Sequence, residues 1–148
     1  MRLAEALKGV GSVFLDTAPV IYLLERHPIY FPRMEAFFRI RRETGMVIVT
    51  SPITLAECLV HPLRRNMGEL AERYRRLIVA GAGTEFHEIG PEAAERAARL
   101  RAACSIPLTD ALQAGVAAEA GCRALLTNDR RLSQITDVSV LVLDDLEV

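Results

Sequence analysis

Short apolar segments separated by longer helical stretches constrain the fold of this chain more than any other sequence feature. Most of these segments are mainly apolar, whereas the third alternates in the way that is typical of an edge strand. Strands that are apolar on both faces favour a mainly parallel sheet covered by helices. The pattern therefore predicts an α/β layer fold. The expected strands are 13–15, 46–50, 84–89, 123–127 and 138–143.

Proline, glycine and capping residues mark the ends of the helices between these strands. A helix that opens at Ser51-Pro52 should stop at His61-Pro62, because proline disrupts a helix interior. Thr109 should cap a later helix. With 148 residues and no linker, repeat or low-complexity tract, the chain is expected to form one domain over 1–148. The expected helices are 19–26, 31–43, 52–61, 64–80, 91–104, 109–121 and a short one at 130–134.

Composition excludes several classes of protein. The net charge of −1 leaves no overall basic surface for nucleic acid, although nearly all the basic residues are Arg and only Lys8 is Lys. Cys58, Cys104 and Cys122 form no C-x-x-C pair, so neither a disulfide framework nor a structural zinc site is expected. The N-terminus does not resemble a signal peptide and no apolar run reaches membrane-spanning length. We therefore expect a cytoplasmic protein without a membrane partner.

Four acidic residues stand where an α/β sheet usually binds its ligand. Asp16 closes the first predicted strand and Asp129 follows the fourth, so both belong to the carboxyl edge of the sheet. Glu57 lies at the border of the apolar face of its helix. Asp110 is in the first turn of a helix and shares a face with Ala114, which favours an inward position. We expect the four carboxylates to approach one another.

Such a group of carboxylates is typical of a metal site. Crowded carboxylates repel one another unless a cation joins them, and oxygen ligands suit Mg²⁺ or Mn²⁺. An ion of this kind supports hydrolysis of a phosphodiester by activated water. Each acid alone also has a structural interpretation, as a helix cap or as a surface residue. Arg130 and Arg131 follow Asp129 directly and are candidates for binding substrate phosphates.

Four motifs that contain these acids resemble those of PIN domains, in the order of that family and over nearly the whole chain. They read DTAPVIYLLE at 16–25, SPITLAE at 51–57, LTDALQA at 108–114 and LTNDRRL at 126–132. The chain departs from the pattern at Ala18, where a polar residue is common, and this departure leaves the four acids unchanged.

The resemblance implies a three-layer fold, with a central parallel sheet of about five strands and helices on both sides. It also implies a Mg²⁺- or Mn²⁺-dependent ribonuclease, with Asp16, Asp110 and Asp129 as metal ligands and Glu57 as ligand or orienting residue. Thr127, and with less support Thr17, would position water or a carboxylate. Short members of the family are often VapC-type toxins, which cut RNA, pair with themselves and are held inactive by a small antitoxin protein.

Other functions fit the sequence less well. A receiver-like phosphoacceptor domain needs a lysine near the fifth strand, and no Lys follows Lys8. A phosphate-binding loop is not expected because Gly81-Ala82-Gly83 leads into a strand and not from a strand into a helix. A dehalogenase-like phosphatase needs an Asp where Ala18 stands, and a flap-type DNA nuclease needs helical insertions that exceed this length. The main alternative is a PIN-like domain that binds RNA or a protein without cutting.

Overall fold

The computed structural model describes all 148 residues and contains one sheet of five parallel strands. The strands lie in the order β3-β2-β1-β4-β5. The predicted α/β fold with a mainly parallel sheet is confirmed, and β3 lies at an edge, as its alternating sequence indicated. The strands are β1 (Ser12–Leu15), β2 (Val47–Thr50), β3 (Thr84–Phe86), β4 (Ala124–Thr127) and β5 (Ser139–Val142).

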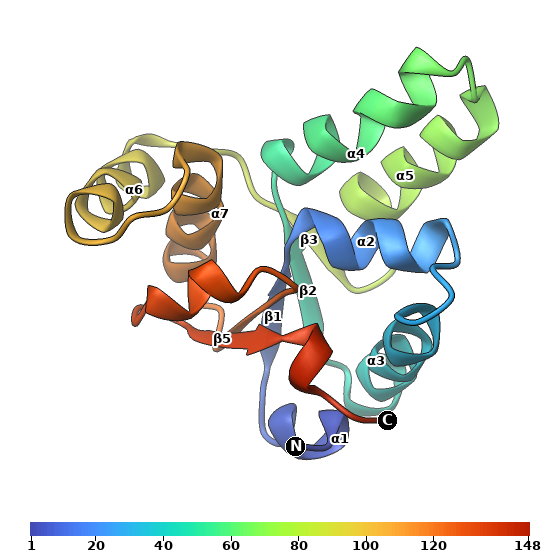
Figure 1. Ribbon diagram of the computed structural model, residues 1–148, viewed down its shortest axis with the longest axis horizontal. Coiled ribbons are helices and arrows are strands. Elements are labelled where there is room, and N and C mark those ends of the chain that lie inside the picture. The colour runs from blue at the N-terminus through green and yellow to red at the C-terminus, as the bar shows by residue number, and fades with distance from the viewer.

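Helices cover both faces of the sheet, which gives the molecule three layers (Figure 1). The pair α6 and α7 lies on one side, and α2 to α5 lie on the other. None of the helices has both the length and the apolar character needed to cross a membrane. The α-helices are α1 (Leu3–Ala6), α2 (Thr17–Leu24), α3 (Phe31–Thr44), α4 (Pro52–Arg64), α5 (Gly68–Ala80), α6 (Pro91–Ala103) and α7 (Leu108–Glu119), and the 3₁₀ helices are η1 (Arg130–Gln134) and η2 (Leu143–Asp145).

The strands other than β3 are mainly apolar because each supplies side chains to two separate cores. Successive side chains of a strand point to opposite faces of the sheet. Val13 and Leu15 of β1 accordingly pack in the core beneath α2 to α5, whereas Phe14 packs in the core beneath α6 and α7. β4 divides in the same way, with Leu126 on the first face and Leu125 on the second. The sheet is therefore buried on both sides, and its strand ends are left as the place for polar chemistry.

Two predicted helix boundaries were wrong. The helix expected to stop at His61-Pro62 continues through Pro62 to Arg64, because the missing N–H of Pro62 removes one helical hydrogen bond to the preceding turn and leaves the bonds of the following residues possible. The break falls instead at Asn66, whose backbone has a φ of 54°. Asn tolerates this left-handed conformation better than most residues, and α5 begins two residues later. Thr109 makes no capping bond, because Pro107 occupies the N-cap position of α7.

Close packing of α6 against α7 depends on Gly115. A methyl group at this position would lie 2.5 Å from the carbonyl oxygen of Ala93, which is backbone and cannot turn away. We predict that Gly115→Ala lowers the free energy of unfolding by about 1–2 kcal/mol, because the clash outweighs the higher helix propensity of alanine. Urea unfolding measures the change. Gly68→Ala is the matched control, since no atom lies within 4 Å of its added methyl, and it should be neutral or stabilising.

Candidate functional site

The candidate site lies at the point where the order of the strands reverses. β1 and β4 are neighbours, with Leu15 opposite Leu126, although the chain visits β2 and β3 between them. In parallel sheets this switch point opens a crevice at the carboxyl ends of the strands. Asp16 follows β1 and Thr127 ends β4, so the polar side chains of both strands meet there.

Asp16 is the most buried of the four acids, with 8% of its surface exposed. Its Oδ1 accepts a hydrogen bond from the backbone N–H of Thr17 at 2.8 Å, and its Oδ2 accepts one from the Thr127 hydroxyl at 2.7 Å. Burial raises the pKa of Asp16, the two hydrogen bonds oppose this rise, and the charges of Glu57 and Asp129 add to it. Asp16 thus caps α2, and no cationic side chain pairs with its carboxylate.

Thr127 connects Asp16 to Asp129. The threonine is fully buried, and its hydroxyl oxygen accepts a hydrogen bond from the backbone N–H of Asp129 at 3.0 Å while donating to Asp16. This single hydroxyl therefore links the carboxylate of Asp16 to the backbone of Asp129. A role of Thr127 in orienting a carboxylate or water stays a prediction.

Glu57 reaches the site from α4 on the other side of Asp16. Its Oε1 accepts a hydrogen bond from the Thr17 hydroxyl at 2.8 Å. Thr17 therefore contacts Asp16 through its backbone and Glu57 through its side chain. Glu57 is exposed, in contrast to Asp16, so its carboxylate is free to turn toward a ligand.

Asp110 completes the group from the first turn of α7. Its side chain is 19% exposed. Burial is the main cause that raises the pKa of Asp110, the charges of Asp16 and Asp129 add to the rise, Arg131 opposes it, and together they bring the pKa to about 6. Other carboxylates can contribute to the pKa of Asp110 in this way only if they lie near it in space. The structure therefore brings the acids of four separate segments within electrostatic reach of one another.

The two arginines that follow Asp129 have different surroundings. The guanidinium of Arg131 binds both oxygens of Asp129, at 2.5 to 3.0 Å, and lies 4.0 Å from Asp110. This hydrogen bonding lowers the pKa of Asp129. Arg130 instead pairs with Asp145, at 2.6 and 2.8 Å, and with Asp144. Arg131 therefore belongs to the acidic group, whereas Arg130 links η1 to the end of the chain.

The acidic group suits a divalent cation by its chemistry, although its side chains are not drawn together around one point. No three Asp, Glu, His or Cys side chains are close enough to hold one ion. Burial is the main cause of the raised pKa values of Asp16 and Asp110, neighbouring carboxylates add to the rise, and Arg131 is the one cationic side chain that pairs with the group. Carboxylate oxygens are the ligands that Mg²⁺ and Mn²⁺ prefer. The donor set therefore fits such an ion. To bind it, Asp129 would have to give up its contact with Arg131.

A buried polar network beneath the acids joins the segments that carry them. The Ser51 hydroxyl donates to the side-chain oxygen of Gln113, and the Gln113 amide donates to Thr54 Oγ1 at 2.7 Å. The Thr54 hydroxyl donates to the backbone oxygen of Leu15 at 3.3 Å. Through these bonds Gln113 ties α7 to α4 and to the end of β1. Gln113 was not identified from the sequence as a structural residue. The one feature that could have indicated it is the presence of an amide side chain within a run of small and apolar residues.

We predict that Gln113→Leu, which keeps the approximate volume, lowers the free energy of unfolding by about 2 kcal/mol. The substitution leaves the buried Ser51 hydroxyl without an acceptor and removes a donor from Thr54. Urea unfolding followed by circular dichroism measures the loss. Gln134→Leu, at an exposed position on η1, should change the value by less than about 0.5 kcal/mol. Equal effects of the two substitutions would contradict a special role for the network.

Sequence and structure comparisons place this site in a family context. A family model described as PIN domain matches residues 13–138, a range that contains all four acids. None of the curated proteins matches the chain.

Several solved structures share the fold. One is a chain of VapBC2 from Rickettsia felis bound to a promoter DNA fragment, with a TM-score of 0.70 and 18% identity over 88% of this chain and 97% of that one. Another is VapC20 from Mycobacterium tuberculosis, described as a sarcin–ricin loop cleaving toxin, with a TM-score of 0.65 and 16% identity over 86% and 98%. A third is FitAcB from Neisseria gonorrhoeae, with a TM-score of 0.67 and 20% identity over 90% and 99%. At these identities the likeness establishes the common architecture.

Proposed function

The chain belongs to the PIN domain family, and from this premise we propose that it is a metal-dependent endoribonuclease that hydrolyses RNA phosphodiesters. The proposal takes residues 1–148 as one PIN-like domain. It assigns Asp16, Glu57, Asp110 and Asp129 as the catalytic group that holds Mg²⁺ or Mn²⁺.

The observation that carries the proposal is a group of four carboxylates at the switch point of the sheet that has Arg131 as its one cationic partner. Asp16 is nearly buried, and burial together with the charges of Asp16 and Asp129 raises the pKa of Asp110 to about 6. A fold gains no stability from such an arrangement in the absence of a cation. Perturbed carboxyl groups in a crevice of this kind are typical of a functional site.

The residues of the site divide the work. A bound Mg²⁺ or Mn²⁺ would lower the pKa of a water molecule and neutralise charge on the phosphate. Thr127 and the backbone N–H of Thr17 hold Asp16 in one orientation, and the Thr17 hydroxyl orients Glu57. Arg131, once released from Asp129, has a guanidinium that suits bidentate contact with a phosphate.

We also propose that the protein is the toxin of a type II toxin–antitoxin pair. Solved structures of the same fold include toxin–antitoxin complexes from Rickettsia felis and Klebsiella pneumoniae, which supports a small antitoxin as partner. The proposal includes a homodimer and action on RNA in the cytoplasm. A sedimentation experiment that gives a monomer at working concentration would count against the dimer.

The alternative is a PIN domain that binds RNA or a protein partner without cutting. The presence of all four acids favours catalysis, since binding alone would gain nothing from burying Asp16. The two functions differ in one result, which is the appearance of shorter RNA products.

Cleavage of a mixed RNA pool by the purified, antitoxin-free protein tests the proposal. We expect products with Mg²⁺ or Mn²⁺ and none with EDTA, and addition of excess metal after EDTA should restore cleavage. Absence of products with either metal, from protein shown to be folded, would favour the binding function.

A further inference from the structure

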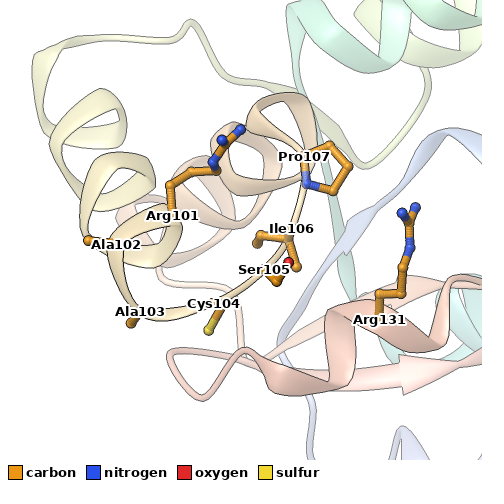
Figure 2. Close-up of a pocket in the computed structure, with 8 residues that line it drawn as sticks. All are labelled: Arg101, Ala102, Ala103, Cys104, Ser105, Ile106, Pro107 and Arg131. Atoms are coloured by element: carbon orange, nitrogen blue, oxygen red, sulfur yellow. The ribbon is translucent and has the colours of Figure 1, made fainter.

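A cleft adjoins the acidic group on the side of α6 and α7. It has a volume of about 570 Å³, which is within the usual range for ligand pockets. One wall is the segment Arg101–Pro107, which ends α6 and leads into α7, and the other wall is Arg131 of η1 (Figure 2). The cleft is therefore formed by two parts of the chain that are far apart in sequence.

The lining of the cleft is positively charged. Arg101 and Arg131 are its only charged residues, and in Figure 2 their guanidinium groups lie on either side of Pro107. No carboxylate lies within 4.0 Å of Arg101, whereas Arg99 on the same helix is 3.7 Å from Glu95. Arg101 thus retains an unpaired charge beside an open cleft, which is an arrangement that attracts an anion.

The chemistry of the other lining residues indicates which anion fits. The cleft contains no aromatic side chain on which a base could stack. Its remaining side chains are small or apolar. Among them, the Ser105 hydroxyl and the Cys104 thiol are the polar groups. Arg guanidinium groups recognise phosphate oxygens without reading the base. The lining therefore suits the backbone of a nucleic acid and not a nucleobase.

Arg131 makes the cleft continuous with the acidic group. The same guanidinium that lines the cleft binds Asp129 and lies 4.0 Å from Asp110. Pro107, on the opposite wall, directly precedes the first turn of α7, which carries Asp110. A strand whose reacting phosphate lies at the four acids can therefore extend past Arg131 into the cleft.

We propose that this cleft binds a backbone phosphate of the RNA strand next to the one that is cut, with Arg101 as its principal contact. The inference rests on the proposed ribonuclease function and extends it with a binding subsite that is independent of sequence. Arg101 is a substrate-binding residue here, whereas Arg131 lies between the subsite and the acids.

The test measures RNA binding without cleavage. Asp16→Asn protein in Mg²⁺ is titrated against a fluorescein-labelled single-stranded RNA of mixed sequence, with fluorescence anisotropy as the readout and several KCl concentrations. Arg101→Ala is added to this background, Arg101→Lys tests whether charge alone suffices, and Arg99→Ala on the same helix is the matched control.

Loss of one phosphate contact defines the expected result. Arg101→Ala should weaken binding about fivefold and reduce the slope of log Kd against log salt by about 0.7. A second RNA of unrelated sequence should lose the same factor, Arg101→Lys should restore the slope, and Arg99→Ala should leave both values unchanged. If the Asp16→Asn protein binds RNA but Arg101→Ala and Arg99→Ala behave alike, this inference alone is wrong. If that parent protein does not bind RNA and the wild type gives no products from the mixed RNA pool, the proposed function fails with it.

Discussion

Asp16→Asn should reduce the rate of RNA cleavage by about a thousandfold while leaving the protein folded. Asn has nearly the shape of Asp but no charge, so the site loses its most buried anion. Its amide would also point a donor toward the Thr127 hydroxyl, which at present donates to Asp16. The hydroxyl must then turn, and the link from Thr127 to Asp129 changes with it.

The fold should survive because the substitution removes a destabilised charge. Burial raises the pKa of Asp16, so a neutral side chain at this position costs the folded state less than the carboxylate does. Thermal unfolding of the metal-free variant should therefore occur at the same temperature as that of the wild type or higher. Asp137→Asn, at an exposed acid remote from the four, is the control and should cleave normally. Because Asn caps a helix as well as Asp does, a variant that unfolds early would show that the charge of Asp16 stabilises the metal-free fold, contrary to this prediction.

The sheet could be predicted from sequence because its signal is local. Every strand except β3 is mainly apolar on both faces, and this requires a helical layer on either side regardless of the details of packing. Asp16 could be assigned to the sheet edge for the same reason, since it stands directly after β1 and needs no knowledge of distant residues. The prediction at Pro62 was wrong because a proline disfavours a helix interior without always ending the helix, and α4 continues for two residues beyond it.

The contacts between segments could not be predicted in the same way. The pairing of Arg131 with Asp129 depends on the tight turn of η1. The pairing of Arg130 with Asp145 depends on how the segment after β5 packs beside η1. Gln113 was missed because its partners come from α4 and lie about sixty positions away in the sequence. Such polar networks form wherever tertiary packing brings donors and acceptors together, and helical periodicity does not report them.

Asp110→Asn should make the metal-free protein more stable at neutral pH and less active. The folded state raises the pKa of Asp110 from 3.8 to about 6, so between these values the folded protein holds a proton that the unfolded chain has released. Folding stability must then fall as pH rises through this window. Well above pH 6 the full penalty, on the order of 3 kcal/mol, is present in the wild type and absent in the variant. Below about pH 4 the two proteins should be equally stable.

Urea unfolding in EDTA at a series of pH values measures this difference. Repeating it with Mg²⁺ shows whether the charge that destabilises the metal-free protein contributes to metal binding. If the acids exist to hold a cation, Mg²⁺ should stabilise the wild type at neutral pH and have little effect on Asp110→Asn, because bound ligand stabilises only the state that binds it. Addition of the metal should thus reverse the order of the two proteins. Parallel pH profiles in EDTA would contradict the raised pKa of Asp110. Equal stabilisation of both proteins by Mg²⁺ would instead show that Asp110 is not a ligand of the metal, and the burial of its carboxylate would then have no functional explanation.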